Sequence, residues 1–81
     1  MRVVPNVIGK DRHARLELVL KHSGPVIVEV VDAQGKTTRT FNAQLPQGSG
    51  AVELELHGFA PGSYVLKVRG AAHGAVRVVL E

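Results

Sequence analysis

The chain has 81 residues, enough for one small domain that buries only about two-thirds of the surface its unfolded chain exposes. Hydrophobic residues make up 44% and charged residues 21% of the sequence, a balance that excludes intrinsic disorder. The absence of cysteine excludes a disulfide framework and cysteine-based metal or redox sites. No apolar run reaches the roughly 18 residues of a membrane span. The start, "MRVVPNVIGK", has no apolar signal-peptide stretch, which fits a cytosolic protein or a module of a longer exported chain.

The net charge of +3 and the sequence pI near 9.8 raise the question of nucleic-acid binding. The excess lies in residues 1–15, where Arg2, Lys10, Arg12 and Arg15 accompany a single aspartate, and basic and acidic residues balance in the remainder. Nucleic-acid binding requires basic side chains clustered on one face, preferably with stacking aromatics. The chain has only three aromatic residues. We therefore expect no nucleic-acid partner.

Apolar and polar residues alternate with period 2 along most of the chain, the pattern of strands that bury one face. In chain order, the clear strands are "RLELVLK", "PVIVEVVD", "AVELELH", "YVLKV" and "AVRVVLE". The stretch "KTTRTFNAQL" predicts a weaker, polar edge strand, and "RVV" near the start predicts a short seventh strand. A helix over "DRHARLELVLKH" is an alternative, although Leu18 would leave its apolar side and Gly24-Pro25 would end it early.

Turn signals separate these strands at intervals of about 8 to 12 residues, the spacing of an antiparallel sandwich. "DAQG", residues 32–35, predicts a type I turn whose glycine is able to adopt positive φ. "GSG", residues 48–50, predicts a hairpin loop, because no helix follows it to form a phosphate loop. We expect residues 1–81 to form a single all-β domain, an immunoglobulin-like antiparallel β-sandwich of about seven strands with no helix. A small barrel is the second choice, and "NVIGKDRHA" is expected to be the least ordered part.

Residues that could carry catalysis or bind metal are few and scattered. The four histidines, His13, His22, His57 and His73, form no pair with metal-ligand spacing. Glu53 and Glu55 share one face of a predicted strand, but no aromatic sugar platform accompanies them, so a solvated pair is expected. The serines lie in turns and none has a nucleophile-elbow context. The sequence predicts neither an active site nor a cofactor.

The order of the motifs resembles the C-terminal sorting domain of type IX secretion substrates of Gram-negative bacteria (the Por secretion system type A tail). "VVPN" precedes an alternating strand, and "VIVEVVDAQGK", a polar strand, "GAVELEL", "FAPGSYVLKV" and "AVRVVL" follow in that order. Val7 stands where the family usually has a second proline, and Arg77 is the one basic residue of a final strand that often carries lysines. The motif residues and recognition candidates are Pro5, Asn6, Asp32, Gly35, Lys36, Pro61, Gly62, Tyr64, Val76, Arg77, Val78, Val79 and Leu80.

This resemblance implies a secretion signal and not a catalyst. Such domains end an exported cargo protein, cross the periplasm, and are delivered by the type IX translocon and shuttle proteins to the outer membrane surface or the medium. A cell-surface sortase commonly removes the domain. The implied partners exclude nucleic acid and small-molecule substrates, and a monomer is expected. If the last strand lies at a sheet edge, its unpaired backbone groups predict recognition by strand addition.

An adhesive or structural sandwich similar to fibronectin type III modules is the alternative, because "FAPGSYVLKV" also resembles the proline-glycine turn and tyrosine before a late strand of that family. The absence of tryptophan argues against it. We expect Tyr64 to place its ring in the core and its hydroxyl on upstream backbone, as in the tyrosine corner of immunoglobulin-type sandwiches. A surface contact for the export machinery is the alternative role of Tyr64.

Overall fold

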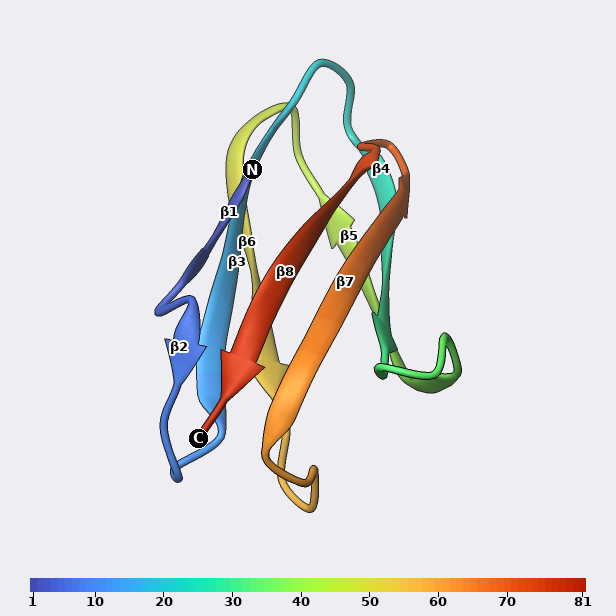
Figure 1. Cartoon of the computed structure of the whole chain (residues 1–81). Coiled ribbons are helices and arrows are strands. Elements are labelled where there is room, and N and C mark those ends of the chain that lie inside the picture. Colours follow the sequence, from blue (N-terminus) through green and yellow to red (C-terminus); the bar gives the residue numbers. More distant parts are fainter.

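Eight β-strands and no helix make up the protein (Figure 1). The structure, a computed structural model, describes all 81 residues. In chain order the strands are β1 (Arg2–Val4), β2 (Val7–Ile8), β3 (His13–Leu20), β4 (Gly24–Val31), β5 (Thr37–Leu45), β6 (Gly48–Glu55), β7 (Gly62–Gly70) and β8 (Gly74–Leu80). No helix is long and apolar enough to cross a membrane.

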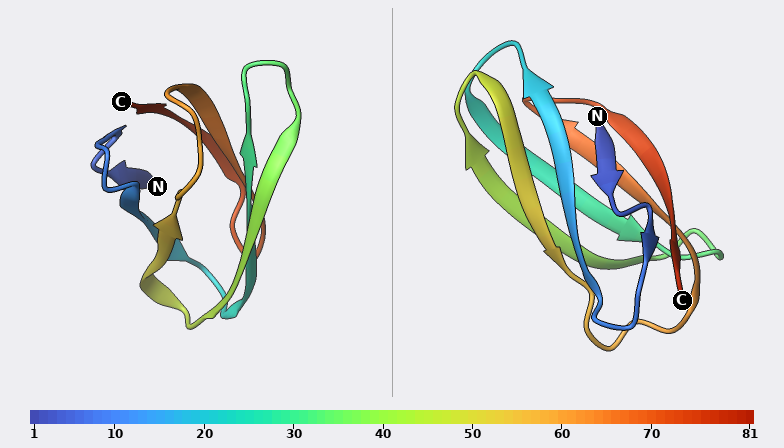
Figure 2. Two further views of the ribbon diagram at one scale, coloured as in Figure 1. Left: turned by 90° about the horizontal axis from the view of Figure 1, so that it is seen from below. Right: turned by 90° about the vertical axis from the view of Figure 1, so that its left-hand side faces the viewer.

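The strands form two sheets that pack face to face as an immunoglobulin-like sandwich (Figure 2). One sheet has the order β1-β3-β6 and the other the order β2-β8-β7-β4-β5. All neighbouring strands are antiparallel except β2, which runs parallel to β8. Strand β5 lies at one edge of the larger sheet, as its polar sequence predicted.

The core lies between the sheets and is built almost entirely from valine, leucine and isoleucine. Seventeen buried residues form one cluster, to which every long strand except β5 contributes alternate side chains. Strand β5 packs its partly buried Phe41, Ala43 and Leu45 against this cluster. Leu16, Val28, Leu54 and Leu66 are fully buried and represent four of these strands. Because β-branched and leucine side chains fill this layer, the core forms with few aromatic residues.

The N-terminal segment belongs to both sheets. Strand β1 pairs with β3, with Val3 opposite Leu16, and β2 then pairs with β8, with Ile8 opposite Leu80. The chain changes sheets at residues 5–6, so β1 and β2 close one open side of the sandwich, as the two views of Figure 2 show. This switch explains why eight strands occur where about seven were expected, because two-residue β2 has no alternation long enough to recognise.

The structure confirms the expected strand over "RLELVLK" and contradicts the hairpin loop expected at residues 48–50. The stretch considered as a helix forms the continuous strand β3, because its alternate residues Leu16, Leu18 and Leu20 enter the core. Residues 48–50 belong to β6 and pair with β3, so the turn before them consists of Pro46 and Gln47. The segment "NVIGKDRHA" contains strand β2 and the buried Arg12.

Candidate functional site

The terminal strand β8, residues 74–80, is not a full edge strand. It pairs with β7 along its length, and β2 covers the other side of its last residues. Val78 and Leu80 are buried, Val76 is half-buried, and Arg77 and Val79 are exposed. The condition for strand addition, a terminal strand at a sheet edge, is therefore not met at the carboxyl end of β8, which the N-terminal segment covers.

A short part of the β8 edge remains open. The amides of Val79 and Glu81 donate to the carbonyls of Asn6 and Ile8, at 3.1 and 2.9 Å. Because backbone groups alternate sides along a strand, those of Ala75 and Arg77 point the same way. No strand pairs with them on that side, so two residues offer unpaired donors and acceptors beside β8.

The "VVPN" motif and the terminal strand are brought together by the β2–β8 pairing. Asn6 accepts the bond from Val79 through its backbone carbonyl, and Pro5 directly precedes it. These two motifs stand at opposite ends of the sequence and lie side by side in the fold (Figure 1). Two recognition candidates predicted separately thus form one continuous piece of surface.

The Asp32–Lys36 connection between β4 and β5 is a tight turn held by one carboxylate. Asp32 accepts hydrogen bonds at Oδ1 from the amides of Gln34 and Lys36, at 2.9 and 3.0 Å. The Gly35 amide donates to the Asp32 carbonyl at 3.0 Å, and Gly35 has φ of 83°. The predicted turn is confirmed, including the positive φ that favours glycine.

Tyr64 forms the expected tyrosine corner at the start of β7. Its hydroxyl donates to the carbonyl of Ala60 at 2.7 Å, and its ring is buried. Phe59 packs against that ring edge to face, with 5.6 Å between centroids. Pro61 and Gly62 lie between the two bonded residues, so the proline-glycine turn is closed by the tyrosine that follows it.

Two arginines hold the loop that precedes this tyrosine, and sequence reasoning missed both. Arg39 of β5 donates to the carbonyls of Glu55 and His57, at 2.7 and 3.2 Å, and lies over the Phe59 ring at 4.7 Å. Arg12 donates to the Phe59 carbonyl at 3.3 Å and to the Gly9 carbonyl at 2.8 Å. Apart from Gly9, their partners lie 16 or more residues away in sequence, so no local motif indicates either role.

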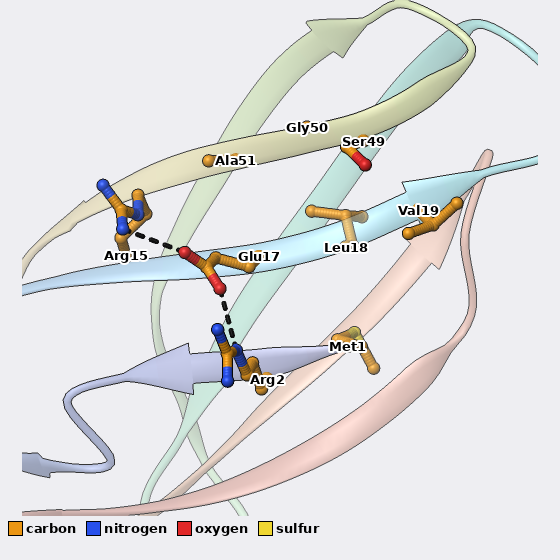
Figure 3. Close-up of a pocket in the computed structure, with 9 residues that line it drawn as sticks. All are labelled: Met1, Arg2, Arg15, Glu17, Leu18, Val19, Ser49, Gly50 and Ala51. Carbon is orange, nitrogen blue, oxygen red and sulfur yellow. Dashed lines mark hydrogen bonds and ion pairs between the residues drawn. The ribbon is translucent and has the colours of Figure 1, made fainter.

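A shallow hollow lies on the outer face of the smaller sheet (Figure 3). Its polar part is Glu17, which accepts from Arg2 Nε at 2.8 Å and from Arg15 Nη2 at 2.9 Å. These two hydrogen bonds, with that of Arg2 the larger influence, hold the pKa of Glu17 below its usual value. Val19 and the small residues 49–51 line the other part. Each arginine is already paired, so the hollow offers little free charge to a ligand.

The histidines and glutamates form exposed pairs and no cluster of metal ligands. His13 and His57 approach opposite oxygens of Glu55, each at 3.6 Å, and all three side chains are about half exposed or more. No group of three potential ligands is arranged to hold a metal ion. Glu53 lies opposite Arg15 on the outer face of the smaller sheet and is exposed.

Comparisons with known proteins leave the family open. No family model matches the chain, and neither the curated proteins nor the solved structures contain a significant match.

Proposed function

We propose that the chain is a non-catalytic C-terminal sorting signal that directs an exported cargo protein through the type IX secretion system. The observation that carries the proposal is the meeting of the "VVPN" segment with the terminal strand, where Asn6 accepts from Val79. Both belong to the motif order that resembles the sorting family. When the two end motifs lie on one surface of the folded domain, a single receptor can contact both of them.

Two further features support a signal that works as a folded, detachable module. The core is one apolar cluster without a disulfide, and the loop around Tyr64 is fixed by hydrogen bonds from Tyr64, Arg12 and Arg39. The open edge at Ala75 and Arg77 offers a small site for an added strand. On this proposal the partners are the translocon, its shuttle proteins and a cell-surface sortase. The chain passes the periplasm as a monomer and ends at the cell surface or outside.

The test appends the chain to a reporter that carries its own signal peptide, in a bacterium with the type IX system and in a matched translocon-deficient strain. We expect the reporter at the cell surface only when the chain and the translocon are both present. External protease digestion measures the surface fraction. Reporter that stays in the periplasm of the competent strain would contradict the proposal.

Deletion of residues 76–81 is a poor version of this test. It removes Val78 and Leu80, which are buried, so loss of display would follow from unfolding alone. Substitutions at exposed positions, with circular dichroism to check the fold, keep the two causes apart.

A fibronectin type III-like adhesive module is the second candidate. The bond from Tyr64 to the Ala60 carbonyl favours it equally, since that corner belongs to immunoglobulin-type sandwiches in general. The same reporter experiment distinguishes the two, because an adhesive module gives no translocon-dependent display.

A further inference from the structure

The fold changes where positive charge is available to a partner. The sequence places the basic excess in residues 1–15, but Arg12 is buried and bonded to two carbonyls. Arg2 and Arg15 share the carboxylate of Glu17. Including the exposed Glu53 and Glu55, the outer face of the β1-β3-β6 sheet has one more carboxylate than arginines.

The outer face of the larger sheet has the opposite balance. Its strands present Lys67, Arg69 and Arg77 to solvent, and Glu29 is their one acidic neighbour. Glu29 accepts from Arg69 Nε at 3.2 Å, whereas Lys67 and Arg77 form no ion pair. Glu81 lies beyond the end of β8, near Gly9. Two positive charges are therefore in excess on this face.

The sheet register brings these basic groups close together. Lys67 and Arg69 are two residues apart on β7, so their side chains leave the same face about 7 Å apart. Arg77 stands opposite Val65 and Ala75 opposite Lys67, which puts Arg77 diagonal to Lys67 at about 7 to 8 Å. The three groups form one cluster across two hydrogen-bonded strands.

Apolar side chains continue this cluster into the middle of the sheet. Val31 is buried although it lies outside the main core, and it pairs across the ladder with half-buried Val65. Ile27, also half-buried, stands opposite Arg69. An apolar centre with a charged rim is the usual composition of a protein–protein contact surface.

We propose that this outer face, defined by Ile27, Val65, Lys67, Arg69 and Arg77, is a docking surface for an acidic protein surface. Charge complementarity selects the partner's sign. An anionic membrane is the less suitable partner, since lipid recognition typically uses clusters of about four to eight basic residues and this face has three. That the acidic partner is a component of the export machinery rests on the function proposed above.

The test compares two double variants of the full chain that have the same net charge. K67E/R77E reverses the unpaired charges of the face, and K10E/K21E reverses two exposed lysines outside it. The probe is poly-L-glutamate, followed by amide chemical shifts in NMR spectra. We expect shifts centred on residues 65–69 and 75–77, and affinity at least about tenfold weaker in K67E/R77E than in K10E/K21E. Equal weakening in both variants, or shifts centred on residues 10–15, would overturn the proposal, as would charge-dependent binding to phosphatidylglycerol vesicles but not to the polypeptide.

The reporter fusions separate this inference from the proposed function. Display of the wild-type and K10E/K21E fusions with loss of the K67E/R77E fusion supports both. Equal display of all three fusions would contradict the proposed docking surface and would still support the proposed sorting signal. Failure to display the wild-type fusion would contradict the proposed sorting function. The poly-L-glutamate experiment would then test the acidic-partner proposal by itself.

Discussion

The side chain of Tyr64 contacts both the backbone of the turn before β7 and the ring of Phe59. Its hydroxyl bonds to the Ala60 carbonyl, and its ring supports Phe59, over which the Arg39 guanidinium lies. Removing the hydroxyl leaves a part-buried carbonyl without its partner while the ring packing stays. The phenol is thus a structural link between the proline-glycine turn and the core.

Tyr64→Phe is expected to lower the free energy of unfolding by about 1 kcal/mol, the contribution of one part-buried hydrogen bond. Urea denaturation measures the change. Thr40→Val, which removes an exposed hydroxyl from β5, is the matched control and should change stability by less than about 0.5 kcal/mol. An equal effect of the two substitutions would show that the tyrosine corner contributes nothing specific.

Glu17 is expected to titrate below the ordinary glutamate range, because Arg2 and Arg15 both donate to its carboxylate and lower its pKa. A lowered folded-state pKa stabilises the fold above the unfolded pKa, and this contribution is lost as pH falls through the folded value. Carbon-detected NMR titration measures the midpoint. Arg2→Gln should raise the pKa, whereas Arg77→Gln, on the other sheet, should leave it unchanged. No response to Arg2→Gln would contradict the assignment of the cause.

At the scale of elements, the N-terminal segment has a larger role than its five strand residues suggest. Strands β1 and β2 pair with different sheets, and each buries one side chain, Val3 and Ile8. Ile8 is fully buried, whereas its neighbour Val7 is about half exposed. The packing of β2 on the core can therefore be tested by comparing substitutions at its two residues.

Ile8→Ala is expected to destabilise the domain by about 2 to 5 kcal/mol, because it opens a cavity beside Leu80. Val7→Ala, at an exposed position of the same strand, should cost less than about 0.5 kcal/mol. Chemical denaturation of the two variants provides the comparison. Similar small effects for both would mean that β2 does not pack on the core as described.

The long strands could be read from the sequence because their alternation reflects a single buried face. The same holds for the turn at Asp32 and for Tyr64, whose signals are local. The short strand β2 and the roles of Arg12 and Arg39 could not be predicted, since each depends on partners more than ten residues away. The closure of the terminal strand by residues 6–8 is a consequence of this tertiary pairing.

At the scale of the whole molecule, the two outer faces differ in charge and the two end motifs meet on one side. The smaller sheet neutralises its arginines with glutamates, and the larger sheet leaves Lys67 and Arg77 unpaired. A sorting signal requires a stable fold together with a surface that a receptor can distinguish. On the two proposals, the core provides the stable fold, and the outer face of the larger sheet provides the surface that a receptor distinguishes.

The most direct measurement is the surface-exposed fraction of a reporter that carries the complete chain at its C-terminus, in a type IX-competent strain and its translocon-deficient counterpart. The sorting proposal predicts protease-accessible reporter in the competent strain and periplasmic reporter in the other. Equal distribution of the reporter in the two strains, with the domain folded by circular dichroism, would contradict it.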